Sequence, residues 1–266
     1  MSVLSKLDLV FCVDLTASMS GFLEAAKRHM AQVLAAFAAQ LEGGLRVAIV
    51  GYRDHCDGDK LLEVYPLTPD LDRVTKSIAK LTVSGGGDAP EAVYTGLVAC
   101  LALDFAPGSY RVVLLVGDAP PHGVGCAGDS LPVDPTGNTL DDMANILETE
   151  GVFVHALAMR AGDALLASSF KRLSISTGGG YHETAAASAV TIVESIARGL
   201  LQDIELDTRL LAQLREGLVV PEPQHEDDLV PSRAELLAKL LRVDKGCVHA
   251  GLMRLRRRRL IDAREA

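Results

Sequence analysis

The sequence lacks the features that mark membrane-spanning and exported proteins. None of the apolar runs in its 266 residues approaches the ~20 residues that cross a bilayer. The first residues also lack the apolar stretch of a secretory signal peptide. We therefore expect the protein to stay in the cytoplasm.

Cysteine is scarce and poorly spaced for structural use. The five cysteines are odd in number, widely separated and never arranged as C-x-x-C, which argues against a disulfide framework and against a structural zinc site. One softer alternative stays open. His55-Cys56 and His122 with Cys126 fall in predicted loops that could face one another and gather a second metal.

The common motifs of hydrolases and phosphoryl-transfer enzymes are also missing. The sequence has no G-x-S-x-G elbow, no Walker loop and no H-E-x-x-H. Asp14 is followed by Leu15 and Thr16, so it also lacks the Asp-x-Asp pattern of haloacid-dehalogenase-like enzymes. We expect a protein that is not an enzyme, with a Mg²⁺-dependent hydrolase as an alternative.

The net charge of −9 hides an asymmetry along the chain. Residues 231–266 hold ten Lys and Arg against four Asp and Glu, a charge of +6, which leaves −15 for residues 1–230. An acidic body with a basic tail suggests two separate roles.

What the sequence does contain is a regular alternation of strand-like and helical segments. Strands are predicted at 7–13, 45–52, 60–65, 110–116, 152–157 and 180–183, the third of them at a sheet edge. Helices are predicted at 19–41, 70–80, 90–103, 139–150, 163–177 and 186–204. This alternation predicts an α/β fold of the doubly wound, Rossmann-like type, with a mostly parallel sheet flanked by helices. Such sheets bind ligands at the carboxyl ends of their strands.

The first strand ends in three oxygen-bearing side chains. Asp14, Thr16 and Ser18 follow the apolar run V-F-C-V in the order Asp-x-Thr-x-Ser. Their carboxylate and hydroxyl oxygens suit a hard cation such as Mg²⁺, which accepts near-octahedral oxygen coordination. The alternative is that the hydroxyls of Ser18 or Ser20 cap the following helix.

Two further acidic loops are expected at the same edge of the sheet. Asp118 ends the apolar run V-V-L-L-V-G, and Asp88 lies in the connection S-G-G-G-D-A-P-E before a helix. Each aspartate alone could be a turn former or a helix cap. Three acidic loops that converge on one strand-end crevice instead predict a cation site.

These motifs resemble those of the von Willebrand factor type A domain. D-L-T-A-S-M is similar to its first metal-site motif, and Asp118 resembles its third-loop aspartate. The phrases G-Y-R-D-H-C-D-G-D, G-G-G-D-A-P-E-A-V and G-D-A-P-P-H-G resemble the intracellular branch that includes alpha-kinase-linked and hemicentin-like members. The resemblance covers residues 5–204, and it implies a site for Mg²⁺, or for Mn²⁺ or Ca²⁺. The implied ligands are Asp14, Thr16, Ser18, Asp88 and Asp118.

One position departs from the family pattern. Ala89 stands where many members of the family place a threonine ligand, so the second-loop contribution would fall to Asp88 or to a water that it holds. An additional carboxylate would make the site more negative and less attractive to an acidic partner. His55, Asp57 and His122 could form a rim that selects partners, or Asp57 could belong to a simple polar turn.

The end of the chain changes character after residue 204. Residues 205–230 are predicted to be a linker, and residues 231–266 a small helical domain. Two helices with a short turn, ending in R-L-R-R-R-R-L-I, resemble the helix-turn-helix of winged-helix regulators. In that interpretation Lys245, His249 and Arg254 would face a DNA groove, and Arg256, Arg257, Arg258 and Arg259 would lie near phosphates. A helical hairpin for protein contacts, or a tail packed on the acidic body, would explain the same charges.

The sequence thus predicts a non-enzymatic, divalent-metal-dependent protein-interaction module, an adaptor or scaffold in an intracellular multi-protein assembly. The resemblance extends to bacterial defence systems by analogy. The protein partner would bind at the metal crevice. The alternative is a DNA-binding transcriptional regulator in which the A domain is the sensor.

Overall fold

A six-stranded sheet forms the centre of the protein in the computed structural model, which describes residues 6–41, 43–217 and 232–262. The strand order is β3-β2-β1-β4-β5-β6. All neighbours pair in parallel except β3, which pairs antiparallel to β2 at the edge. The strands are β1 (Leu7–Asp14), β2 (Leu45–Tyr52), β3 (Leu62–Thr68), β4 (Tyr110–Gly117), β5 (Val152–Ala158) and β6 (Tyr181–Glu183). The predicted fold class is confirmed, including the edge position of the third strand.

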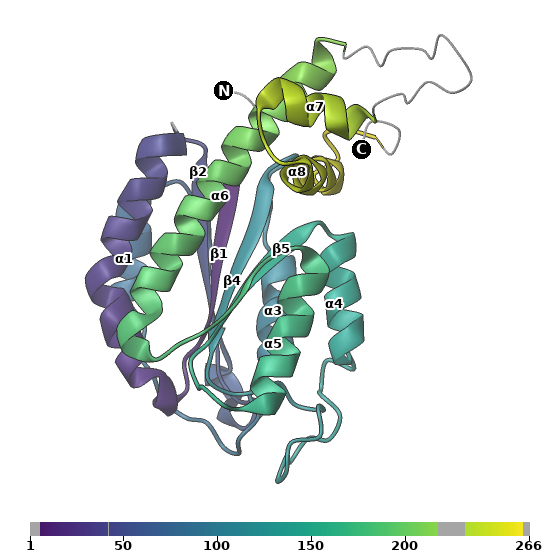
Figure 1. Cartoon of the computed structure of the whole chain (residues 1–266). Coiled ribbons are helices and arrows are strands. Elements are labelled where there is room, and N and C mark those ends of the chain that lie inside the picture. The colour runs from purple at the N-terminus through teal and green to yellow at the C-terminus, as the bar shows by residue number, and fades with distance from the viewer. Residues whose placement is uncertain (1–5, 42, 218–231, 263–266) are drawn as a thin grey trace.

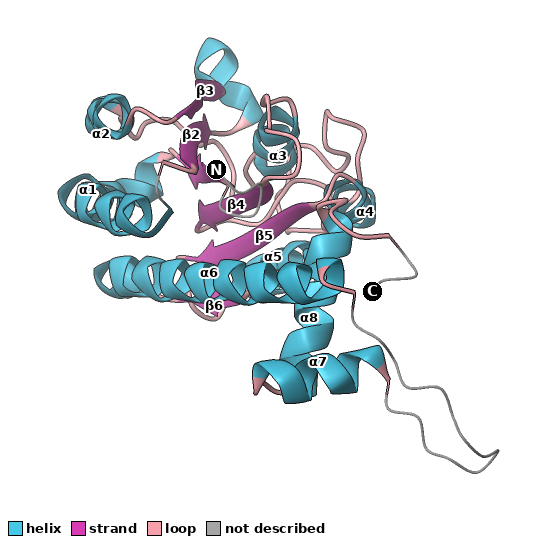
Figure 2. Cartoon of the chain, turned by 90° about the horizontal axis from the view of Figure 1, so that it is seen from above, coloured by secondary structure: helices cyan, strands magenta, loops and turns pink. Residues whose placement is uncertain are grey.

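Helices cover both faces of the sheet (Figure 2). One face packs against α1 (Ser20–Leu41), α2 (Leu71–Lys80) and α6 (Ala186–Arg215). The other face packs against α3 (Val93–Leu101), α4 (Leu140–Thr149) and α5 (Ala164–Thr177). Because both faces are covered, the central strand β1 is buried along its whole length, which explains its nearly unbroken apolar sequence.

Helix α3 begins later than the sequence predicted. Its first residue is Val93, whereas the predicted helix began at residue 90. The backbone N–H of Glu91 donates to Pro120 O at 3.0 Å, and Glu91 forms an isolated parallel bridge with Pro121. This pairing holds residues 90 and 91 in extended backbone, so the helix starts only after them.

Helix α6 is longer than predicted and corrects part of the linker prediction. It continues to Arg215, so residues 205–215 are helical and the predicted linker is wrong there. The physical reason is tertiary packing, because Leu210 and Leu211 of this extension are buried against the C-terminal helices. Most of the remaining predicted linker, residues 218–231, lies outside the described residues.

The C-terminal segment contains the two predicted helices, α7 (Arg233–Leu241) and α8 (Lys245–Arg257). Ser232 and Glu235 form a capping box at the start of α7. The two helices share a small core with the end of α6 and lie beside it, above the sheet (Figure 1). They pack where β4 and β5 begin, opposite the carboxyl ends of those strands, since Arg258 donates to Gly108 O at 3.2–3.3 Å.

None of the helices in the described residues combines the length and the apolar character that crossing a bilayer requires.

Candidate metal centre

Four of the five predicted ligands meet where β1 and β4 end. Asp14 Oδ1 accepts hydrogen bonds from the Thr16 backbone N–H at 2.8 Å and from its hydroxyl at 2.7 Å. The hydroxyls of Thr16 and Ser18 lie 3.2 Å apart, and Ser18 donates to Asp118 Oδ1 at 2.9 Å. Each hydroxyl therefore gives its proton to a carboxylate, which leaves oxygen lone pairs available for a cation. Ser18 therefore contacts a carboxylate of another loop. Asp14, Thr16, Ser18 and Asp118 together are called the first cluster.

The first cluster has a buried carboxylate oxygen without a partner. Asp14 is fully buried, and its Oδ2 atom makes no hydrogen bond. Burial and, to a smaller extent, the charge of Asp118 raise the pKa of Asp14 to about 7, against the lowering effect of the Thr16 hydrogen bonds. An unpartnered buried carboxylate costs free energy, and a divalent cation bound there would remove that cost. These residues therefore fit the hard cation that the sequence predicted.

Glu91 is a further acidic residue at this site, and the sequence analysis did not assign it a role. Its side chain is 4 % exposed, and its Oε2 atom has no hydrogen-bond partner. Its Oε1 atom and the Thr16 side chain both lie against Gly86, where a Cβ atom would be 3.2 Å and 3.3 Å from them. Burial raises the pKa of Glu91 to about 9, helped by the charges of Asp14, Asp54, Asp57 and Asp118. The pKa of Glu91 thus depends both on the first cluster and on a second group of acids beside it.

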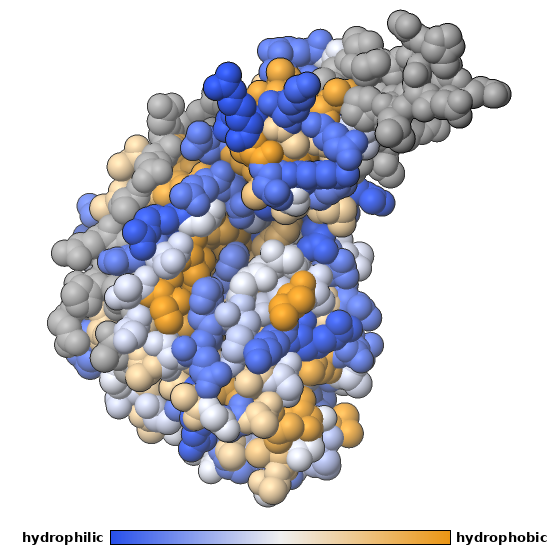
Figure 3. Space-filling view, viewed as in Figure 1, coloured by the Kyte–Doolittle hydropathy of each residue, from blue (hydrophilic) through white to orange (hydrophobic). Residues whose placement is uncertain are grey.

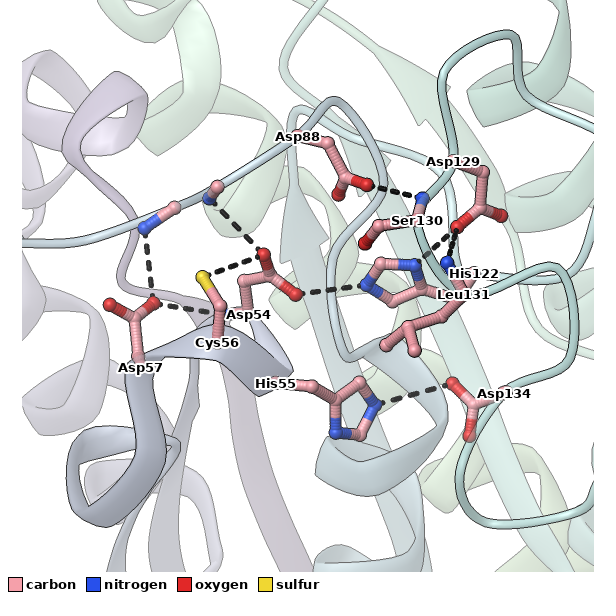
Figure 4. Close-up of polar contacts among 12 residues, drawn as sticks. Asp54, His55, Cys56, Asp57, Asp88, His122, Asp129, Ser130, Leu131 and Asp134 are labelled. Atoms are coloured by element: carbon pink, nitrogen blue, oxygen red, sulfur yellow. Dashed lines mark hydrogen bonds and ion pairs between the residues drawn. The ribbon is translucent and has the colours of Figure 1, made fainter.

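Asp88, the fifth predicted ligand, takes part in that second group. Its Oδ2 atom accepts from the Ser130 backbone N–H at 2.6 Å, in the long loop after β4. Asp88, Asp54 and His122 each place one possible ligand atom within 4.8 Å of the others (Figure 4). The prediction that Asp88 supplies the second-loop ligand of the first cluster is not reflected in these contacts. The glycine run turns Glu91 toward the first cluster and Asp88 toward the loop after β4.

The predicted rim residues are less exposed than a rim requires. His122 is fully buried, with Nε2 2.9 Å from Asp54 Oδ1 and Nδ1 2.8 Å from Asp129 Oδ1. His55 is 13 % exposed and lies 3.6 Å from Asp134 Oδ2, an ion pair if the ring is protonated. Asp57 accepts from the backbone N–H groups of Asp54 and Gly86. The rim prediction is therefore wrong for His122, since contacts between loops bury its ring.

The environment of His122 is strongly anionic. Burial works against the charged imidazole, but the hydrogen bonds that His122 donates to Asp129 and Asp54 outweigh burial and raise the pKa of His122. The pKa of Asp54 is lowered, because hydrogen bonds from Cys56 and His122 overcome the effect of its burial. The loop 123–137 is fixed to the sheet edge by the contact between Asp129 and His122.

Sequence comparison identifies the part of the chain that carries this site. Residues 8–125 match the family described as von Willebrand factor A domain. This part of the chain thus carries the sequence pattern of a von Willebrand factor A domain. The chain is 28% identical over 140 residues to the alpha-protein kinase vwkA of Dictyostelium discoideum. It is 32% identical over 116 residues to a protein of Acanthamoeba polyphaga mimivirus named as an ariadne-like RING finger protein.

These two relatives are much longer than the part of them that the A domain matches. The alignments cover 51% and 43% of this chain, but only 22% and 11% of the relatives. The words kinase and RING finger therefore describe those relatives and not this chain.

Solved structures share the fold of the A domain. Proximal thread matrix protein 1 from the mussel byssus, solved with a zinc-occupied MIDAS motif, matches 74% of this chain with a TM-score of 0.57 and 18% identity. The match covers 46% of that protein chain. The vWF domain of the type V pili tip protein Mfa5 from Porphyromonas gingivalis matches 75% of this chain and 96% of its own, with a TM-score of 0.56 and 15% identity.

The basic tail of the A domain does not present its arginines as a DNA-binding surface. Arg254 is 8 % exposed and binds Asp207 with Nε and Nη2, the shortest contact being 2.8 Å. Arg258 is 5 % exposed, 3.6 Å from Asp207 Oδ2. Arg257 pairs with Glu148 at 2.7 Å. These contacts correct the predicted DNA-facing role of Arg254 and the predicted phosphate-facing role of Arg258.

The remaining predicted DNA contacts are exposed, apart from the half-buried Arg257. Lys245, His249, Arg256 and Arg259 are exposed, and Lys245 forms an ion pair with Glu235 at 2.7 Å. Figure 3 shows a mostly hydrophilic surface, in blue, over α7 and α8, interrupted by hydrophobic patches. Two exposed apolar side chains of these helices are Leu240 and Met253. Within residues 232–262, the tail is thus a helical extension that packs on the body through buried ion pairs, and the contacts of these residues give no support for a helix-turn-helix.

Proposed function

We propose that this protein is a divalent-metal-dependent protein-interaction module that acts through the first cluster. The observation that carries the proposal is the unpartnered Oδ2 atom of Asp14, buried among the hydroxyls and carboxylates that the neighbouring loops supply. Oxygen ligands of this kind favour Mg²⁺ or Mn²⁺, and Ca²⁺ if the loops allow more ligands. The zinc-occupied MIDAS motif of the mussel protein supports a cation at this place in the fold.

In the first cluster, the buried residues would bind the cation, and the exposed residues would leave it accessible to a partner. Asp14 and Thr16 are buried and would hold the cation from below, while Ser18 is exposed and Asp118 is half-buried. The exposed side of the site faces solvent at the carboxyl ends of the strands. When bound, the cation supplies a positive charge and an open coordination position, which attract a carboxylate of a protein partner.

Glu91 modifies this proposal in a direction that a simple adhesion site would not show. Burial raises the pKa of Glu91 to about 9, so the carboxyl group keeps its proton at neutral pH until a bound cation favours the charged form. A site with this extra charge binds the cation more tightly but attracts an acidic partner less strongly. Replacing Glu91 by Gln should therefore weaken Mg²⁺ binding. Binding of the partner should then depend more strongly on an acidic side chain of that partner.

The proposal also includes a role for the protein in the cell. The protein would act without catalysis, as an adaptor of an intracellular assembly, with a protein partner at the crevice. We do not extend the proposal to DNA, because Arg254 and Arg258 are buried in ion pairs with the A domain.

The experiment is a calorimetric titration of Mg²⁺ and Mn²⁺ into the full chain after removal of metals. We expect the wild type to bind one cation at the first cluster, and Asp14→Asn and Ser18→Ala to bind at least tenfold more weakly. Asp72→Asn, which removes an equal charge from the exposed first turn of α2, is the matched control and should not change binding. A pull-down with and without EDTA then tests the partner. Unchanged affinity in Asp14→Asn would refute the proposal.

A further inference from the structure

A second group of metal-ligating side chains lies beside the first cluster and shares no residue with it. It consists of Asp54, after β2, Asp88, in the glycine-rich loop, and His122, after β4 (Figure 4). One ligand atom from each lies within 4.8 Å of the others. Asp54 Oδ1 and His122 Nε2 are already 2.9 Å apart. Two ligands of a tetrahedral zinc ion stand roughly 3.3–3.5 Å apart, given bonds of about 2.0–2.2 Å, so modest side-chain shifts would complete such a site.

Each of these three side chains is held at one atom, which leaves another atom for a ligand. Asp54 Oδ2 accepts from Cys56 Sγ at 3.0 Å and from the Gly87 N–H at 3.1 Å. Its Oδ1 atom faces the His122 ring. The Cys56 thiol therefore acts on Asp54 as an orienting donor.

Asp88 follows the same arrangement. Its Oδ2 atom is held by the Ser130 N–H at 2.6 Å, whereas its buried Oδ1 atom has no hydrogen-bond partner. A buried carboxylate oxygen without a donor is a costly feature, and it is one that a cation would satisfy.

His122 completes the set. Its Nδ1 atom lies 2.8 Å from Asp129 Oδ1, and Asp129 is itself fixed by the backbone N–H groups of Gly123 and Leu131. In metal proteins the nitrogen of histidine that does not bind metal commonly donates to a carboxylate in this way. Asp129 thus accepts the Nδ1 proton and fixes the ring, so that loss of the Nε2 proton would leave a lone pair directed toward Asp54 and Asp88.

We propose that Asp54, Asp88 and His122 form a second metal site, selective for a borderline cation of the Zn²⁺ class. An imidazole with two carboxylates suits zinc better than Mg²⁺, which prefers oxygen ligands and waters. The site would join the loops after β2, after β4 and before α3 into one unit beside the first cluster. On binding, the proton that sits between His122 Nε2 and Asp54 Oδ1 leaves to solvent, and both atoms turn to the metal.

The test is zinc binding by the full chain in the presence of millimolar Mg²⁺, which fills the first cluster. Calorimetry and equilibrium dialysis with metal analysis should find one tightly bound Zn²⁺ per chain. We expect His122→Gln and Asp88→Asn to lose at least tenfold in zinc affinity, and Asp129→Asn to lose about tenfold because it only orients the ring. Circular dichroism establishes that each variant is folded.

Matched controls separate this site from surface histidines and from the first cluster. His249→Gln removes an exposed histidine of α8, and Asp14→Asn removes a ligand of the first cluster. Both should bind Zn²⁺ like the wild type. Failure of Mg²⁺ binding in the wild type would concern the first cluster alone, so the two proposals fail separately.

A spectroscopic measurement keeps the proposal testable if His122→Gln does not fold. X-ray absorption at the zinc edge of the wild type should show one imidazole together with oxygen ligands. Equal zinc binding by His122→Gln, loss of zinc binding in Asp14→Asn, or a zinc shell without imidazole would each overturn the proposal.

Discussion

The two ends of the sheet treat buried carboxylates in opposite ways. At the amino ends of the strands, fully buried Asp207 is paired with Arg254 and Arg258 of the C-terminal segment. At the carboxyl ends, buried Asp14 and Glu91 face other acids and keep one oxygen each without a partner. The first end provides its own cations from the chain. The second end is complete only with a cation from outside, which is the difference between a structural ion pair and a binding site.

The largest effect should come from breaking the paired end. Arg254→Ala leaves Asp207 buried without its bidentate partner, so we expect the free energy of unfolding to fall by about 3–5 kcal/mol. Urea denaturation measures this change. Arg256→Ala is the control on the same helix, where an exposed side chain should cost less than about 0.5 kcal/mol. A loss in Arg254→Ala no larger than that of the control would contradict the comparison.

The open end should respond to added metal with a smaller effect of opposite sign. Mg²⁺ at a hundred times its dissociation constant should raise the free energy of unfolding by about 2.7 kcal/mol. Asp14→Asn should abolish this gain, yet without metal it should not destabilise the protein, because it removes a buried carboxylate that has no cation. Thermal unfolding with and without Mg²⁺ measures both. A variant that is much less stable than the wild type in EDTA would show that Asp14 has a structural role instead.

The smallest of the three effects is a dependence on pH in the absence of metal. The folded pKa values of Asp14 and Glu91, about 7 and about 9, exceed those of an unfolded chain, near 4. Between about pH 4 and 9 the folded state therefore holds more protons than the unfolded state, and its stability falls as pH rises. We expect a loss of at least about 1.4 kcal/mol between pH 5 and 9, the value of one pKa unit.

Metal should reverse that trend. Since protons compete with the cation for the same carboxylates, saturating Mg²⁺ should make stability rise with pH over the same range. Urea denaturation at several pH values, in EDTA and in Mg²⁺, distinguishes the two cases. The comparison would be wrong if stability in EDTA were flat or rose with pH.

The three ligands that lie close together in the chain could be predicted from the sequence. The position of Glu91 depends on a contact with a distant loop, and it was not predicted. Asp14, Thr16 and Ser18 follow one strand within five residues, so their convergence could be predicted from the strand end alone. The loop before α3 contains two acids, Asp88 and Glu91, and either could turn toward the cluster. The pairing of Glu91 with the backbone of Pro120 decides the matter, and no local pattern reveals a contact between residues so far apart.

The charged residues of the tail show the same limit, because their burial could not be predicted from the sequence. A run of four arginines reads as a basic patch, because sequence spacing gives the composition of a helix but not which of its faces is covered. Asp207, which pairs with both Arg254 and Arg258, lies on the extension of α6, in residues that were predicted to be a linker. An error in one helix boundary therefore hid the partners of the buried arginines.

The sequence by itself determined the alternation of strands and helices, the type of sheet, and an oxygen-rich loop at the end of β1, since these depend on hydrophobic periodicity and on residues near one another in the chain. Tertiary structure alone decided that Glu91 faces the first cluster and that Asp54, Asp88 and His122 meet. It also decided that Arg254 and Arg258 are buried. The physical reason is that each of these outcomes depends on the direction of a side chain relative to a distant loop or helix, which only the packed fold defines.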